Sequence, residues 1–130
     1  MKRIIFILLI VASAICSCNK HHEEGEGGFT DIILSQSLVS FGQEGGTVSI
    51  ESSNVTYILI SDILCVDTEK HYNPDGNWTT SLEADGIKAE VDRSESNKIN
   101  ITVTPSANIN DWIIFVGYAS VTKEIRVKQN

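Results

Sequence analysis

The stretch KINITVT, residues 98–104, decides the fold because its apolar and polar residues alternate without interruption. This alternation is typical of a β-strand that turns one face to a core and the other to water. It predicts that Ile99, Ile101 and Val103 face the core. The segment EIRVK, residues 124–128, repeats the pattern with Ile125 and Val127. Because sheets with one apolar face bury that face against each other, the two segments predict a sandwich.

The rest of the chain after residue 30 shows the same period of two and no long apolar stripe at helical spacing. Turn sequences separate the segments at residues 42–46, at Asp75-Gly76 and at Asp85-Gly86. About seven to eight short strands in this arrangement predict an all-β, antiparallel β-sandwich over residues 30–130. The predicted strands are residues 32–40, 47–51, 56–61, 63–66, 87–93, 98–104, 112–118 and 121–128.

Residues 1–17 have the pattern of a secretory signal peptide. Lys2 and Arg3 give a cationic start, residues 4–14 are apolar except for Ser13, and small residues follow. The apolar run is too short for a membrane-spanning helix, which takes about 20 residues. We therefore expect this segment to be removed during export.

The cleavage region resembles the lipobox of bacterial lipoproteins, in which an aliphatic residue and two small residues precede a cysteine. Counting back from Cys18, Ser17 and Ile15 fit this pattern, while Cys16 is unusual in the middle position. Counting back from Cys16 instead places branched Ile15 beside the cut, which is a poorer fit. The resemblance implies that Cys18 carries a diacylglyceryl group and a further acyl chain, and that this N-terminal lipid holds the protein on a membrane.

Residues 18–29 contain His21, His22 and three glutamates, which raises the alternative of a metal site. However, Cys16 leaves with the signal peptide and acylated Cys18 has no thiolate to offer. The glycines of the segment cost backbone entropy to order, and little apolar surface offsets that cost. We therefore predict a flexible tether. Its acidic residues resemble the export signal of surface lipoproteins from Bacteroidetes-type bacteria, which implies a lipid-anchored protein of the outer membrane that faces the cell exterior.

The charge of the chain excludes one class of partner. Without residues 1–17 it carries 8 basic and 17 acidic residues, a net charge of −9. Such a surface repels phosphate backbones, and the sequence contains no basic stripe, so we expect no nucleic-acid partner. Cys65 would be left as the one free thiol, and its apolar neighbours in residues 63–66 predict burial in the core.

Residues 38–50, LVSFGQEGGTVSI, resemble the opening of the BACON domain, an immunoglobulin-like module common in Bacteroidetes proteins. In that family a strand ending in an aromatic residue leads through a Glu-Gly-Gly-Thr turn into the next strand. The close is similar too, with residues 101–103, an Asn-containing loop, an apolar strand and residues 125–129. The resemblance covers residues 35–129 and implies an immunoglobulin-like sandwich. The chain departs from the family at Tyr57-Ile58, where a tryptophan is usual, and at Trp112, where an arginine is common.

The longest connection, residues 67–77, is the expected place for a ligand. Tyr72 and Trp78 flank it, with Asn73, Asp75 and Asn77 between them. Aromatic faces beside amide and carboxylate groups suit sugar rings, which present apolar C–H faces and polar hydroxyl edges. These five residues are therefore the predicted ligand-binding residues. The alternative for Trp78 is that its side chain packs over the end of the sandwich.

Cys65 and His71, six residues apart, offer the nucleophile and base of a small hydrolase, but a cysteine within an apolar strand is usually part of the core. A calcium site in residues 67–75 needs oxygen ligands at alternate positions, and His71 and Tyr72 interrupt that series. The sequence contains no nucleophile elbow, phosphate loop or His-Glu-x-x-His motif. We therefore expect no catalytic residue, metal or cofactor.

Together these patterns predict a lipoprotein whose sandwich is a non-catalytic binding or assembly module. Its expected partner is a cell-surface glycan or another protein of a surface complex. The alternatives are a purely structural spacer and a small Cys/His hydrolase.

Overall fold

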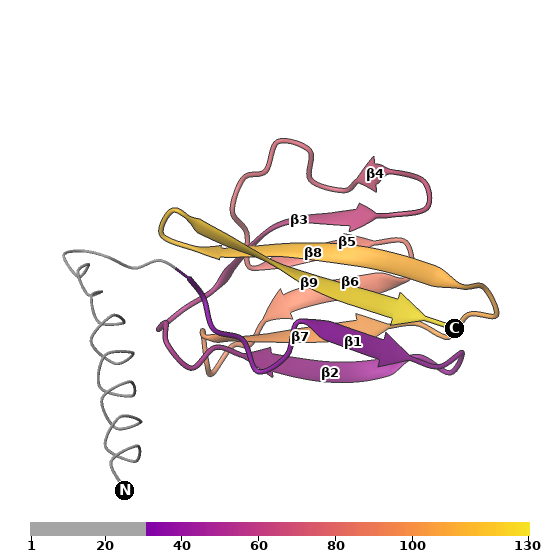
Figure 1. Ribbon diagram of the computed structural model, residues 1–130, viewed down its shortest axis with the longest axis horizontal. Coiled ribbons are helices and arrows are strands. Elements are labelled where there is room, and N and C mark those ends of the chain that lie inside the picture. The colour runs from indigo at the N-terminus through magenta and orange to yellow at the C-terminus, as the bar shows by residue number, and fades with distance from the viewer. Residues whose placement is uncertain (1–30) are drawn as a thin grey trace, which may run out of the picture. The chain divides into compact units, whose positions relative to one another are not determined.

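Two stacked β-sheets make up the part of the chain that the computed structural model describes, residues 31–130 (Figure 1). No helix in this part is long and apolar enough to cross a membrane. Its nine strands are β1 (Leu38–Phe41), β2 (Gly46–Glu51), β3 (Leu59–Cys65), β4 (Lys70–His71), β5 (Ser81–Ala84), β6 (Ile87–Val91), β7 (Lys98–Val103), β8 (Asn110–Tyr118) and β9 (Val121–Gln129). The signal peptide, Cys18 and the tether predicted for residues 1–29 lie outside the described residues.

The strand order is that of an immunoglobulin-like sandwich. One sheet has the order β1-β9-β8-β3-β4 and the other the order β2-β7-β6-β5. Strands β2, β7 and β6 thus share one layer, and β9, β8 and β3 share the other, as strands B, E, D and G, F, C do in immunoglobulin domains. All pairs are antiparallel except β1 with β9, which is parallel. The predicted all-β sandwich is confirmed.

The period of two places β-branched residues between the sheets. Ile99, Ile101 and Val103 of β7 are buried, as predicted, and so are Ile125 and Val127 of β9. Burial of apolar surface stabilises a fold by roughly 25 cal/mol per Å². The one cysteine of the described residues is a free thiol, so packing holds the two layers together.

The structure departs from the predicted strands mainly before β6. The predicted strands 56–61 and 63–66 form one strand, β3, whose register with β8 shifts between Ile60 and Asp62. The extra residue, Ser61, forms a bulge that breaks the period of two, so the sequence reads as two strands. Only the last part of predicted strand 32–40 forms, as β1. Strands β4 and β5 are missing from the prediction because they are short and largely exposed.

A buried glutamine ties several strand ends together where β9 stops. The Gln129 residue is only 1% exposed. Its Nε2 donates to the carbonyl oxygens of Gly42 (3.2 Å) and Thr104 (3.0 Å), and its Oε1 accepts from Nδ2 of Asn110 (2.9 Å). These partners follow β1, follow β7 and begin β8, so one side chain joins both sheets.

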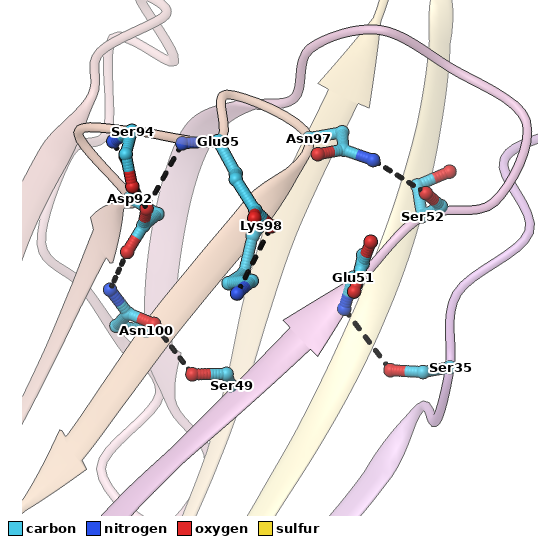
Figure 2. Close-up of polar contacts among 10 residues, drawn as sticks. All are labelled: Ser35, Ser49, Glu51, Ser52, Asp92, Ser94, Glu95, Asn97, Lys98 and Asn100. Carbon is cyan, nitrogen blue, oxygen red and sulfur yellow. Dashed lines mark hydrogen bonds and ion pairs between the residues drawn. The ribbon is translucent and has the colours of Figure 1, made fainter.

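Asp92 organises the connection between β6 and β7 (Figure 2). Its Oδ1 accepts from Nδ2 of Asn100 (2.9 Å). Its Oδ2 accepts from the Ser94 hydroxyl (2.8 Å) and from the backbone N–H groups of Ser94 and Glu95 (both 3.0 Å). Asn100 in turn accepts from the Ser49 hydroxyl (2.7 Å), which links β7 to β2. The hydrogen bonds from Asn100 and then Ser94 hold the pKa of Asp92 well below its usual range.

Asp92 should therefore stabilise the fold in a pH-dependent way. Because its folded-state pKa lies below the unfolded value of about 3.9, its contribution is present above that pH and is lost as the pH falls. We expect Asp92→Asn to lower the melting temperature at pH 7 and to flatten its decline below about pH 4. Thermal unfolding as a function of pH measures this, with Asp67→Asn, at an exposed carboxylate, as the control. An acid dependence equal to that of the unmodified chain would contradict the assignment.

Candidate functional site

Three aromatic side chains from three separate connections meet at one end of the sandwich. Tyr57 lies in the β2–β3 connection, Trp78 in the β4–β5 connection and Tyr118 at the end of β8. The rings of Tyr57 and Tyr118 have centroids 4.7 Å apart and planes tilted by 54°. The three side chains line a small pocket of about 120 Å³ together with Leu59, Gly117 and Ala119. We refer to Tyr57, Trp78 and Tyr118 as the aromatic cluster.

The aromatic cluster depends on a glycine beneath it. Gly117 pairs with Leu59 of β3 and Thr122 of β9 and has no side chain to cover the sheet. A Cβ atom at Gly117 would lie 2.1 Å from Cη2 of Trp78, so the six-membered ring of the indole lies directly against this position. Trp78 nevertheless remains 44% exposed and Tyr57 41% exposed. The cluster is therefore both fixed on the fold and open to a ligand.

The structure does not bring the two predicted aromatic residues together. Leu59 pairs with Gly117 at one end of β3, where Trp78 lies, and Cys65 pairs with Trp112 at the other. Tyr72 lies at that second end, in a pocket of about 430 Å³ that Cys65 and Trp112 also line. The two rings thus contact separate pockets and form separate surfaces.

The hydroxyl of Tyr72 is already engaged. It donates to Oδ2 of Asp85 at 2.7 Å, and Nζ of Lys70 lies 4.7 Å from the centroid of the ring. The hydrogen bond to the Asp85 carboxylate raises the pKa of Tyr72 to about 12. Tyr72 therefore keeps its proton at physiological pH and donates it in the hydrogen bond to Asp85.

The three predicted polar residues have different roles. Asn73 braces the β4–β5 connection, because its Nδ2 donates to the carbonyl oxygens of Ser61 (2.8 Å) and Asn77 (2.9 Å). The Asp75-Gly76 turn is closed by a bond from Gly76 N–H to the Asn73 carbonyl (2.9 Å), inside the connection rather than between paired strands. Asp75 and Asn77 are exposed. Of the five predicted ligand-binding residues, Trp78 alone lines the pocket of the aromatic cluster.

Cys65 and His71 do not form a nucleophile–base pair. His71 lies opposite Leu64 and Cys65 opposite Lys70. Since neighbouring residues of a strand point to opposite faces, the Cys65 and His71 side chains lie on opposite faces of the sheet. They accordingly line different pockets. Cys65 is half-buried rather than fully buried as predicted, and burial raises the pKa of its thiol, which makes it a poorer nucleophile.

The calcium hypothesis for residues 67–75 gains no support from the geometry. Within residues 31–130, no three His, Cys, Asp or Glu side chains gather in a way that could hold a metal ion.

Sequence reasoning missed Tyr57 and Tyr118 as candidate site residues. Both lie at the border between a strand and a connection, and 61 positions of sequence separate them. The one local signal is the Gly117-Tyr118 pair, in which a glycine precedes an aromatic residue near the end of an apolar run. Their proximity follows from the pairing of β3 with β8, which the sequence pattern does not specify.

Comparison with known proteins supports the fold. No family model matches the sequence, and no curated protein matches it. Among solved structures, the chain is similar to the NMR structure of a protein from Bacteroides thetaiotaomicron, with a TM-score of 0.59 and 12% sequence identity. The match covers 82% of this chain and 92% of that chain. At this identity the likeness shows the fold alone: a β-domain of this architecture occurs in a Bacteroides protein.

Proposed function

We propose that the chain is a lipid-anchored protein of a bacterial cell surface, and that its β-sandwich is a non-catalytic binding module of the BACON type. The aromatic cluster is the proposed contact surface, and a cell-surface glycan is the proposed ligand. The observation that carries this proposal is the convergence of Tyr57, Trp78 and Tyr118, from three connections, on one open pocket.

The position of the cluster supports a binding role. In variable immunoglobulin domains, the connections between strands B and C and between F and G form the binding loops at one end of the sandwich. The corresponding connections here are β2–β3, which carries Tyr57, and β8–β9, which Tyr118 adjoins. Rigid aromatic side chains on such loops give contact area at a small cost in conformational entropy.

The chemistry of the cluster favours a sugar ring as ligand. An exposed indole face attracts the C–H face of a sugar, and neighbouring tyrosine hydroxyls can bond to its polar edge. The exposed Asn77 side chain, next to Trp78, adds a polar group of the same kind.

A protein of a surface complex is the second candidate partner. Ile33 is 55% exposed, and its N–H donates to Oδ1 of Asn54 (2.9 Å), which places it beside the connection that carries Tyr57. An exposed aliphatic side chain contributes to protein interfaces rather than to sugar stacking.

The membrane anchor rests on the sequence around Cys18. Ile15 and Ser17 precede this cysteine at the lipobox positions, and the apolar segment before them is too short to span a bilayer. Mass spectrometry of the native N-terminus should show a chain that begins at acylated Cys18. A chain that still begins at Met1, with no added lipid, would contradict the anchor.

Trp78→Ala should weaken glycan binding, with an affinity loss of at least about 10-fold. Aromatic hot-spot residues at the centre of a binding surface typically lose about 2 kcal/mol or more of binding free energy when they are truncated to alanine, and Trp78 is the largest exposed ring of the cluster. A glycan array probed with the full chain identifies the ligand, and titration of that ligand against the variant measures the loss.

Tyr72→Ala is the matched control, because it removes an aromatic ring at the opposite end of β3. The control should bind as the unmodified chain does. Binding to no glycan, or equal binding by the Trp78 variant, would remove the sugar hypothesis and leave the protein partner as the candidate.

A further inference from the structure

We propose that Asp62 is a positioning residue: together with His71 it latches the β4–β5 connection onto the outer face of the sheet and so fixes Trp78. The latch is a property of the folded chain. Its effect on a ligand rests on the proposed function.

The bulge in β3 gives Asp62 its place. Ser61 is left out of the ladder, because Ile60 pairs with Val116 and Asp62 with Phe115. Ile63 faces the core, so the Asp62 side chain points to the outer face. Even so, the Asp62 residue is only 8% exposed. A carboxylate on the outer face of a two-sheet fold is normally in water. Here the β4–β5 connection shields it, since Asp62, His71, Asn73 and Pro74 line one pocket.

Among residues 31–130, the partners of this carboxylate come from β3, from β4 and from the β4–β5 connection. Oδ2 of Asp62 bonds to Nδ1 of His71, which is the last residue of β4. Oδ1 accepts from the backbone N–H groups of Ile63 and Asn73, both at 2.8 Å. A buried carboxylate that lost these partners would be strongly unfavourable, so the bonds and the position of the connection are maintained together.

Asn73 passes this constraint towards Trp78. Its N–H is held by Asp62, and its side-chain Nδ2 donates to the carbonyl oxygens of Ser61 and of Asn77. Asn77 directly precedes Trp78, and on the other side Thr79 exchanges two backbone hydrogen bonds of 2.8 Å with Ile60. The backbone is therefore held on both sides of Trp78. At Thr79 it is held by the backbone hydrogen bonds to Ile60. At Asn77 it is held by the side chain of Asn73, whose position depends on Asp62.

The latch prepares the aromatic cluster for a ligand. When a loop is already ordered, binding does not have to offset the entropy of ordering it. If the proposed function is right, opening the latch should weaken ligand binding by roughly 10-fold while leaving the contact residues unchanged.

The indole N–H signals of Trp78 and Trp112 test the latch without any ligand. The chain contains these two tryptophans, and Trp78→Phe assigns their NMR signals. In the full chain, Asp62→Ala should move the Trp78 signal towards that of an exposed indole. The Trp112 signal should stay in place, because its Nε1–H donates to the Asp85 carbonyl at the other end of the sandwich (3.3 Å). Asp62→Asn keeps an acceptor oxygen for the Asn73 N–H and should restore the Trp78 signal.

Asp67→Ala removes an exposed carboxylate elsewhere in the same region and is the control. The proposal is overturned if the Trp78 signal stays in place in Asp62→Ala, or if Asp67→Ala moves it equally. If both indole signals lose their folded positions, the Asp62 variant has not folded, and Asn73→Ala decides, because it keeps the backbone bond to Asp62 but removes the side-chain bonds to the carbonyl oxygens of Ser61 and Asn77. A moved Trp78 signal then supports the latch and an unmoved one refutes it. A failed glycan array leaves this result unaffected, so the two proposals fail separately.

Discussion

Gln129→Ala should destabilise the fold by about 4 kcal/mol, more than any surface substitution. The change removes the hydrogen bonds of the buried Gln129 side chain to the carbonyl oxygens of Gly42 and Thr104 and to the amide of Asn110. Each such hydrogen bond contributes about 0.5–1.5 kcal/mol, and the empty volume left by the side chain adds to the loss. Against a typical total stability of about 5–15 kcal/mol, this is a large fraction. For a domain of this size we expect a melting temperature lower by roughly 20 °C.

Gln43→Ala is the matched control for this substitution. Gln43 is exposed and lies one residue beyond Gly42 in the β1–β2 turn. Its own contribution should be within about 0.5 kcal/mol, as for most surface changes. Chemical denaturation of both variants, with equal slopes, compares the two free energies of unfolding. A Gln129 variant as stable as the Gln43 control would show that the three hydrogen bonds do not hold the sheets together.

Gly117→Ala should remove the aromatic cluster while leaving the sandwich folded. The new methyl group would lie 2.1 Å from Cη2 and 2.6 Å from Cζ3 of Trp78. The indole swings away because these atoms are at the end of a side chain, whereas the backbone carbonyl oxygen of Val121, 3.0 Å from the new methyl group, requires a small shift of β9. We expect a destabilisation of about 1–3 kcal/mol, as for other overpacked sites. Glycan affinity should fall at least as far as in Trp78→Ala, roughly 10-fold or more.

Gly42→Ala provides the comparison, because the new methyl group there meets only the flexible carboxyl group of Glu44. The position of the Trp78 indole signal and the binding titration should both be unchanged in this control. The expectation for Gly117 is contradicted if the Gly117 variant keeps the Trp78 signal of the unmodified chain, or if it binds the ligand as well as the control does.

The fold was largely predictable because alternation of side chains is a local property. Ile99, Ile101 and Val103 alternate with polar residues, and a strand places such residues on one face whatever its neighbours are. The pattern failed where the backbone broke the period, at the Ser61 bulge. The predicted last strand, residues 121–128, also stops one residue before the end of β9. Gln129 is buried like Ile125 and Val127. The sequence does not mark it as a core residue, because the burial of a polar side chain depends on hydrogen-bond partners elsewhere in the chain.

The candidate site was predictable only in part, because its residues are joined by strand pairing rather than by sequence spacing. Trp78 could be predicted because it is an aromatic residue beside a long polar connection, and it does line the pocket of the aromatic cluster. Tyr72 is six positions away in sequence but lies at the other end of β3, because β4 folds back against that strand. Nothing in the sequence marks Asp62 as a buried residue, because its burial results from the β4–β5 connection that covers it.

The parallel pairing of β1 with β9 has a mechanical consequence. β1 is the first strand of the domain and β9 the last, and they run side by side in the same direction, with Leu38 opposite Arg126 and Phe41 opposite Gln129. A force that pulls the two ends of the domain apart therefore drags these strands past each other along their axes. Their hydrogen bonds bear the load together and rupture in shear, rather than peeling open one after another. A domain held at its N-terminal side and pulled from its C-terminal side would thus resist stretching at this pair first.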